Sequence, residues 1–143
     1  MSGDDKKFFR AEIIKYSPTV FQAKMPVIKV RFESLPLPVL ALVDSGASNS
    51  MIHKQVASQV GMKVDWKNKF TGTGAGGGFV YYKSEPLEVE MFGNKYILSF
   101  NIPDDENFAW GCILGQDTIF RLAKVTFKRY REEFEISFRK DIN

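Results

Sequence analysis

The sequence predicts a mostly β fold, and three observations support that prediction. Apolar and polar residues alternate along several stretches, as they do in strands with one buried face. The run Val39–Val43 is apolar without alternation, which is typical of a strand buried on both faces. Only two short segments, at about 50–60 and 117–122, have helical character. Strands therefore dominate the expected structure.

Period-two alternation locates most of the expected strands. The alternating stretches are 28–33, 87–91, 96–102 and 134–138. Gly93 and Asn94 separate the second stretch from the third, and this pair suits the positive φ angles of a tight hairpin turn. We therefore expect a two-stranded hairpin that turns at Gly93-Asn94.

The longer helical segment shows the spacing of an amphipathic helix. Ile52, Val56 and Val60 recur every four residues, and Gly61 follows as a C-terminal stop. This predicts a helix from about Ser50 to Val60. The second helix, at 117–122, is shorter.

Length and composition limit the classes of protein to consider. The 143 residues suit one domain, so we expect a flexible polar tail at 1–7 and a single domain at 8–143. Apolar residues at 44% and charged residues at 26% exclude a disordered chain. The net charge of +3 comes from residues 121–143, which hold seven basic and four acidic groups. We expect a solvated surface there and no nucleic-acid partner.

Cysteine content and hydropathy bear on the compartment. Cys112 is the only cysteine, so the chain forms no internal disulfide, which fits a reducing compartment. No apolar stretch reaches the roughly 18 residues of a membrane helix. The first seven residues are polar and acidic, unlike a signal peptide. We expect a soluble cytoplasmic protein with no membrane partner.

An acidic residue stands where the apolar run ends. Asp44 follows Val39–Val43 directly and opens the sequence Asp44-Ser45-Gly46-Ala47-Ser48. A carboxylate at the end of a buried strand is costly unless its charge is satisfied. Taken alone, this tripeptide also suits an ordinary Asx turn. Two other segments are needed to distinguish the two interpretations.

The first of these segments is rich in glycine. Residues 71–80 include Gly72, Gly74 and Gly77, which match the dinucleotide pattern G-x-G-x-x-G. That pattern requires a helix immediately afterwards, whereas residues 79–82 are Phe-Val-Tyr-Tyr and predict a strand. A glycine-rich hairpin tip that can close over an extended ligand fits better.

The second segment is Cys112-Ile113-Leu114-Gly115, followed by the short helix. By itself it indicates a core strand and a turn. Together with Asp44-Ser45-Gly46-Ala47 and the glycine-rich hairpin, in this order and spacing, it resembles the retropepsin-type aspartic proteases. The resemblance covers residues 24–127. It implies a single-lobe, acid-protease-like closed β-barrel with one or two short helices.

The resemblance also implies site residues. Asp44 would be catalytic, with Ser45, Gly46 and Ala47 supporting the catalytic loop. Ile113, Leu114 and Gly115 would support that loop from behind. A substrate-binding flap would contain Gly74, Ala75, Gly76, Gly77, Gly78 and Phe79.

The expected chemistry requires a second copy of the chain. Amide hydrolysis by activated water needs two carboxyl groups that share a proton, and one chain supplies only Asp44. We therefore expect a homodimeric aspartic endopeptidase that acts on peptide or protein substrates, with no cofactor and no metal.

Two functions of other classes remain open. One is a non-catalytic dimeric module of the same fold that binds peptides by strand addition. The other is a nucleic-acid-binding β domain that uses the basic C-terminal end, although its aromatic residues partly alternate as in a core strand.

Several single residues have ordinary interpretations as well. We expect His53, the only histidine, at the surface or as a helix cap, and Cys112 as a small core residue. The acidic residues 104–106 suit a solvated loop. Trp66 and Trp110 either line substrate pockets or only pack.

Overall fold

Strands make up most of the protein. A computed structural model describes residues 7–19, 23–74 and 77–141. The α-helices of this part are α1 (Lys54–Val60) and α2 (Ile119–Leu122). The strands are β1 (Glu12–Lys15), β2 (Ser17–Pro18), β3 (Lys24–Met25), β4 (Val27–Val30), β5 (Val39–Val43), β6 (Met51–Ile52), β7 (Val64–Gly74), β8 (Gly77–Ser84), β9 (Leu87–Met91), β10 (Asn94–Leu98), β11 (Asn101–Pro103), β12 (Cys112–Leu114), β13 (Ala123–Lys128) and β14 (Glu133–Phe138).

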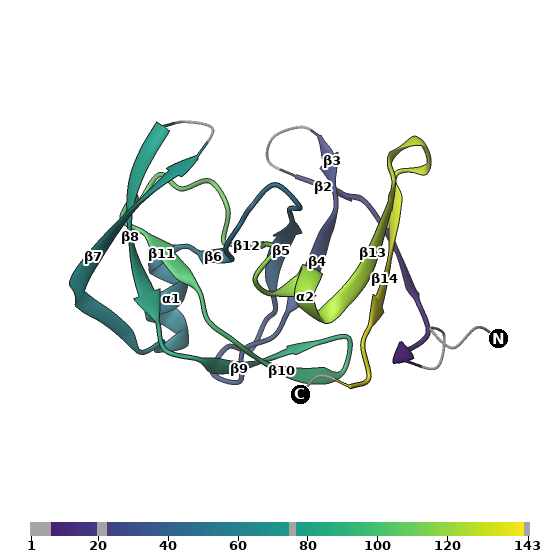
Figure 1. The fold of residues 1–143 in the computed structure, drawn as a ribbon, viewed down its shortest axis with the longest axis horizontal. Coiled ribbons are helices and arrows are strands. Elements are labelled where there is room, and N and C mark those ends of the chain that lie inside the picture. The colour runs from purple at the N-terminus through teal and green to yellow at the C-terminus, as the bar shows by residue number, and fades with distance from the viewer. Residues whose placement is uncertain (1–6, 20–22, 75–76, 142–143) are drawn as a thin grey trace.

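A seven-stranded sheet forms the centre of the fold, with the order β4-β5-β12-β6-β11-β8-β7. Strand β12 lies between β5, to which it is parallel, and β6, to which it is antiparallel. The β7–β8 hairpin projects at one end of the molecule, and the sheet β1-β14-β13 lies at the other (Figure 1). The loop from β5 to β6 therefore passes over the end of β12.

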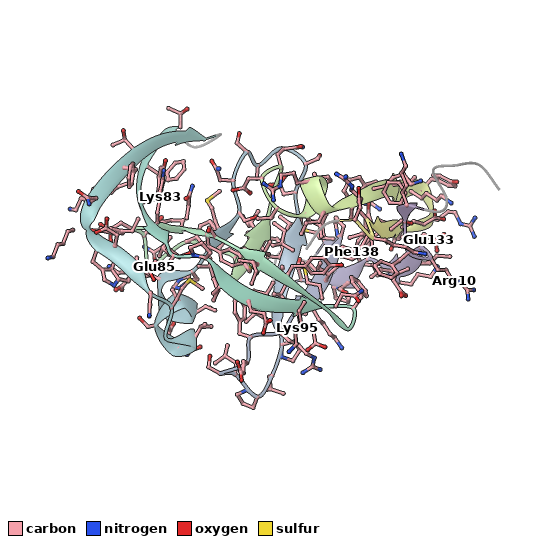
Figure 2. All side chains as sticks on the ribbon, turned by 60° about the horizontal axis from the view of Figure 1, so that its bottom comes forward. Arg10, Lys83, Glu85, Lys95, Glu133 and Phe138 are labelled. Carbon is pink, nitrogen blue, oxygen red and sulfur yellow. The ribbon has the colours of Figure 1, made fainter. Side chains whose placement is uncertain are left out.

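The alternating stretches 28–33, 87–91 and 96–102 bury one face each, as predicted, whereas in 134–138 Ser137 is buried as well and only Glu135 is partly exposed. The core includes Val30 from β4, Val89 from β9, Ile102 from β11 and Ile136 from β14, all at most 1% exposed. Charged side chains such as Arg10, Lys83 and Lys95 lie on the outside (Figure 2). The stretch 96–102 is divided between β10 and β11 rather than forming one strand.

The closed barrel that the resemblance implies is not confirmed. The described strands form four separate sheets, and the largest ends at β4 and β7 without closing. The β9–β10 hairpin meets the residue that follows β4 through one isolated backbone bridge, Arg31 with Glu90, and then turns away. One bridge is too short to close the sheet. The mostly β class and the two short helices are confirmed.

The first helix begins later than its apolar spacing suggests. Met51 and Ile52 pair with β12 as strand β6, and α1 starts at Lys54. Ile52 is fully buried in the sheet, so its place in the apolar series reflects sheet packing rather than a helix face. Gly61 ends the helix with φ 74°, as predicted. Helix α2 also starts two residues later than expected, at Ile119.

The hairpin turn lies one residue earlier than expected. Asn94 pairs with Met91, so the two turn residues are Phe92 and Gly93. Their φ angles are 52° and 80°. Gly93 adopts this conformation without steric cost, whereas a bulky residue such as Phe92 rarely does.

Candidate active site

Asp44 continues the pairing of β5 with β12. Its backbone N–H donates to the carbonyl of Leu114 at 3.0 Å, one position beyond the end of β5. Its own carbonyl accepts from Ala47 N–H at 3.2 Å, which closes a tight turn. Three of the five β5 residues, Ala41 to Val43, are buried. A rigid, buried strand thus fixes the position of the Asp44 backbone.

The Asp44 side chain is partly exposed and is held by its own loop. Carboxylate atom Oδ1 accepts a hydrogen bond from Gly46 N–H at 2.9 Å. A Cβ atom at Gly46 would lie 3.2 Å from the same oxygen, so glycine leaves the space that this contact needs. Within the described residues, no hydrogen bond occupies Oδ2. That oxygen is available to a ligand or a second carboxyl group.

Gly115 lies directly beneath the loop. A Cβ atom there would overlap the carbonyl oxygen of Ala47 and lie 3.0 Å from that of Asn49. The next backbone N–H groups, of Gln116 and Asp117, donate to the carbonyls of Ala47 at 2.8 Å and Ser48 at 3.2 Å. The turn after β12 and the loop after β5 are therefore joined by direct backbone contact.

Sequence reasoning missed a polar cluster that holds the far end of this loop. Asp117 accepts from Ser50 N–H at 2.8 Å and from Asn49 Nδ2 at 3.2 Å. Ser50 Oγ accepts from Gly115 N–H at 3.0 Å and also hydrogen-bonds the hydroxyl of Thr118. Both hydroxyl residues are buried. Nothing in a single sequence distinguishes them from surface residues.

The structure brings the predicted loop residues together around the turn that follows Asp44. Ser45, Gly46 and Ala47 form the turn that follows Asp44, and Ile113, Leu114 and Gly115 lie behind it in and after β12. The side chain of Gln116, which was not predicted, donates from Nε2 to Ser45 carbonyl at 2.8 Å. The roles expected for these residues remain predictions.

The glycine-rich segment forms a hairpin, as its sequence predicts. Gly74 pairs with Gly77 and Thr73 with Gly78, between the long strands β7 and β8. Gly77 has φ 105°, a conformation that favours glycine. The expected flap residues Ala75 and Gly76 lie outside the described residues. In Figure 1 the hairpin and the loop after β5 extend toward the same side of the molecule.

Aromatic side chains pack along one face of the hairpin. Phe79 and Phe70 each lie 5.6 Å from Tyr81, measured between ring centroids. A Cβ atom at Gly72 would come within 3.0 Å of the Phe79 ring. Glycine at this position therefore lets Phe79 lie against the backbone of the opposite strand.

A second apolar cluster lies on the other face of β5 and reaches the Asp44 loop. Its buried members are Val27, Leu42, Ala47 and Ile113, and Met25, Met51, Phe108 and Trp110 pack around them. The burial of β5 on both faces is thus confirmed for its second half, whereas Leu40 is 51% exposed. Ala47 belongs both to this cluster and to the loop, so an apolar surface borders the carboxylate.

The other candidate residues have structural roles. His53 caps helix α1: Nδ1 accepts from Gln55 N–H at 3.0 Å, and Nε2 lies 3.0 Å from the carbonyl of Glu106. Cys112 is fully buried, and burial raises the pKa of its thiol well above the ordinary range, so it is not a nucleophile.

The acidic loop and the two tryptophans also contact neighbouring residues. Asp104 pairs with Lys54 at 3.1 Å, and the described residues contain no group of three or more His, Cys, Asp or Glu suited to a metal ion. Trp66 packs edge-on against Tyr82 at 4.9 Å, and Trp110 belongs to the second apolar cluster.

The comparisons with known proteins agree with this geometry. The sequence profile of a family described as aspartyl protease matches residues 28–91, which include Asp44 and the glycine-rich hairpin. No curated protein sequence matches the chain at a significant level. Neither helix in the described part of the chain is long and apolar enough to cross a membrane.

Several solved structures share the fold. The retropepsin-like aspartic protease from Rickettsia conorii has a TM-score of 0.61 and 13% identity, over 90% of this chain and 91% of its own. The retroviral protease-like domain of Ddi1 from Leishmania major has a TM-score of 0.56 and 23% identity, over 71% and 79%. EIAV protease complexed with the inhibitor HBY-793 has a TM-score of 0.51 and 21% identity, over 72% and 92%.

The fold and the partial sequence match lead to the same family. Asp44 lies inside the matched segment, and the strand arrangement that positions it recurs in these solved structures. The chain thus has the fold of the retropepsin-like aspartic proteases and carries an aspartyl protease sequence match, which confirms the resemblance indicated by its motifs.

Proposed function

We propose that the protein is an aspartic endopeptidase that hydrolyses peptide bonds with one Asp44 from each of two identical subunits. The observation that carries the proposal is the state of the Asp44 carboxyl group. A buried strand fixes its backbone, Gly46 N–H orients Oδ1, and Oδ2 remains open among the described contacts. A carboxylate that serves only as a turn cap needs no such support from a second strand.

The reaction follows from two carboxyl groups about 3 Å apart that share one proton. The ionised carboxylate takes a proton from water as the water oxygen attacks the peptide carbonyl carbon. The protonated carboxyl gives its proton to the carbonyl oxygen. The carboxyl group that took the water proton gives it to the departing nitrogen as the C–N bond breaks, and the other carboxylate takes a proton from a hydroxyl of the diol. A new amine and a new carboxyl group result, and the pair again holds one proton. Both carboxyl groups act as acid and base in turn.

A homodimer supplies the second acid. The chain contains one Asp-Ser-Gly sequence, so a two-fold axis between two Asp44 side chains is the simplest way to form the pair. In this arrangement Ser45, which is exposed, faces the partner loop. The contact from Gln116 to the Ser45 carbonyl would fix the orientation of that surface.

An extended peptide fits the surroundings of Asp44. The apolar cluster around Leu42, Ala47 and Ile113 offers contacts to apolar side chains, and the β7–β8 hairpin would act as the flap above the peptide backbone. We further propose that residues 8–143 act as one domain and that the protein works in the cytoplasm, which its single buried cysteine suits.

The experiment compares Asp44→Asn with the wild type across pH 3–8, by peptide-library cleavage and by thermal unfolding. Asp105→Asn is the matched control, because Asp105 is exposed and its bond from Asn107 N–H, at 2.9 Å, suits an amide oxygen equally well. We expect the cleavage rate of the Asp44 variant to fall by more than 10²–10⁴-fold, the usual contribution of general acid–base catalysis, because both halves of the site change.

Thermal stability distinguishes a catalytic role of Asp44 from a purely structural one. Two adjacent carboxylates repel when both ionise, so the amide variant should unfold no earlier than the wild type at neutral pH. An early-unfolding variant, together with a wild type that cleaves nothing, would instead support the non-catalytic peptide-binding module.

A further inference from the structure

Strand β4 is an end strand of the seven-stranded sheet, and one edge of it is open. The carbonyl of Pro26 accepts from Val43 N–H at 2.9 Å. Hydrogen-bonded and non-bonded pairs alternate in an antiparallel ladder, so Ile28 also directs its backbone groups toward β5. Lys29, one position on, directs its N–H and carbonyl to the outer edge.

The neighbouring strand leaves this edge just before Lys29. On the same outer edge, the N–H and carbonyl of Arg31 exchange hydrogen bonds of 2.9 Å with Glu90 at the end of β9. Strand β9 then turns at Phe92 and Gly93 instead of continuing beside β4. Among the described residues, nothing hydrogen-bonds the outward groups of Lys29. Such an edge is a template for an added strand.

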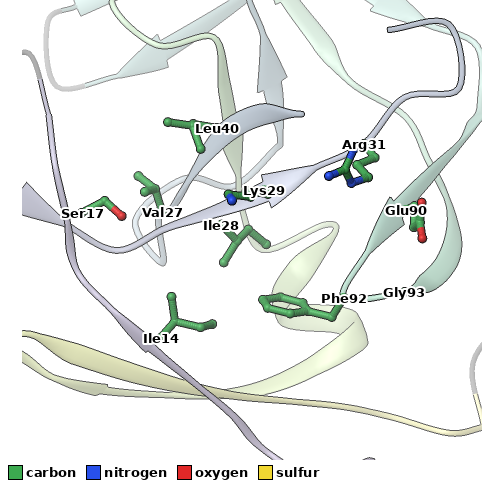
Figure 3. A pocket seen from close by; sticks show the side chains of 10 residues that line it. All are labelled: Ile14, Ser17, Val27, Ile28, Lys29, Arg31, Leu40, Glu90, Phe92 and Gly93. Carbon is green, nitrogen blue, oxygen red and sulfur yellow. The ribbon is translucent and has the colours of Figure 1, made fainter. Parts of the chain in front are cut away.

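A cavity of about 400 Å³ adjoins the open edge, between β4, β1 and the β9–β10 turn. The side chains of Ile14, Ile28 and Phe92 point toward one another around it (Figure 3). Phe92 is 37% exposed although it is apolar. The cavity therefore leaves apolar surface open to solvent at the end of β4.

Two positively charged side chains lie beside the cavity. Lys29 and Arg31 alternate with buried residues along one strand, and both are exposed. Neither forms an ion pair with a described residue. Among the described residues that line the cavity, Glu90 is the one carboxylate, so these residues contribute two positive charges and one negative. This balance favours an acidic ligand.

We propose that the outer edge of β4 binds an extended segment of a protein partner in which acidic and apolar residues alternate. Paired residues of neighbouring strands share a face, so an acidic side chain opposite Lys29 would lie near both cations. The apolar side chain opposite Ile28 would enter the cavity beside Phe92. Backbone bonds to Lys29 give affinity and the cavity gives selectivity.

This binding edge is separate from Asp44. Lys29 pairs with Leu40, and Asp44 follows four residues later along β5, roughly 13 Å away at the rise of a strand. One segment of a partner can therefore occupy β4 while another reaches Asp44. Binding here requires no peptide hydrolysis, so the proposal stands or falls independently of the protease function.

The test uses acetyl-Glu-Leu-Glu-Leu-Glu-amide, in which acidic and apolar residues alternate, as the probe and the whole chain as the protein. Amide hydrogen exchange followed by NMR should show rapid exchange at Lys29 in the free protein and at least tenfold slower exchange at saturating probe. The double variant Lys29→Glu/Arg31→Glu should bind the probe at least tenfold more weakly by calorimetry. The matched double variant Lys67→Glu/Lys69→Glu, on exposed residues of β7, should stay within twofold of the wild type.

Two control peptides complete the experiment. Replacing every Leu by Gly in the probe, or every Glu by Lys, should abolish measurable binding. Equal binding of the lysine peptide, or an unchanged Lys29 exchange rate at saturation, would overturn the proposal. Self-association of the free chain that protects the Lys29 amide and is lost in the Lys29→Glu/Arg31→Glu variant would also overturn it, because the occupant would then be a second copy.

Discussion

Gly115→Ala places a methyl group where the Asp44 loop meets its support. The added Cβ would overlap the carbonyl oxygen of Ala47 and lie 3.0 Å from that of Asn49. Both contacts are with backbone atoms, so a side-chain rotation cannot relieve them. The loop and the turn after β12 must separate, which stretches the bonds from Gln116 and Asp117 to that loop.

The expected cost combines two effects. Overfilling a packed site costs about 1–3 kcal/mol, and each of the two stretched hydrogen bonds contributes about 0.5–1.5 kcal/mol. The total destabilisation is about 2–6 kcal/mol, a large part of the 5–15 kcal/mol that stabilises a typical domain. For 143 residues, 1 kcal/mol shifts the melting temperature by about 3 °C. We therefore expect Gly115→Ala to lower Tm by about 6–18 °C.

The assay is thermal unfolding by circular dichroism, with Gly111→Ala as the matched control. A Cβ atom at Gly111 meets only Val39 and Val56 side chains, at 3.5 and 3.9 Å, which are ordinary contacts. This control should unfold within about 2 °C of the wild type. If Gly115→Ala unfolds as late as the control, the loop is not held by the backbone contact described here.

Three further predictions concern the hairpin, a buried carboxylate and the dimer. Gly78→Val should reduce cleavage at least tenfold with little change in Tm, since a Cβ there meets only Gly72 carbonyl at 3.7 Å; unchanged turnover would exclude a flap role. The hydrogen bond from Lys15 lowers the pKa of Glu133, so its stabilisation is complete above the ordinary carboxyl pKa of 4.5 and is lost as pH falls through the lowered value. Glu133→Gln should therefore lower Tm at pH 7 and converge with the wild type at strongly acidic pH; a pH-independent difference would contradict this. Specific activity should rise with protein concentration and then level off, whereas a fully active monomer would contradict the shared site.

Local patterns in the sequence predicted what depends on local burial. Alternation identified the strands around Ile28 and Val89 because each of those strands exposes one face and buries the other. It also identified the strand around Ile136, although Glu133 and Ser137 are buried there as well. The apolar run before Asp44 correctly marked a central strand, although only its second half, Ala41 to Val43, is buried on both faces. Gly61 marked the end of α1 because its positive φ favours glycine.

The one-residue error in the hairpin turn is local. Met91 pairs with Asn94, three residues on, and Phe92 takes a positive φ that a bulky residue rarely adopts. The error at the start of α1 arose because a distant residue decides the structure. Ile52 fits a helical series, yet Cys112, 60 residues away, pairs with it as a strand. That partner is not visible to a local pattern.

The contacts around the candidate site that the sequence did not predict also depend on distant residues. Ser50, Thr118 and Asp117 meet only when the loop after β5 folds over the turn after β12. The open edge at Lys29 exists because β9 turns away from β4, and alternation within β4 carries no sign of it. Resemblance supplied Asp44, but its supporting contacts required the tertiary structure.

A crystal structure of the assembled protein would test the central claim most directly, through the distance between the carboxyl groups of two Asp44 residues. We expect a two-fold dimer in which these groups lie about 3 Å apart, close enough to share one proton. The Oδ2 atom, which has no partner among the described residues, should contribute to that contact or to a bound water. A dimer that holds the two carboxyl groups more than about 6 Å apart, beyond the range of strong coupling between charges, would contradict a shared catalytic pair.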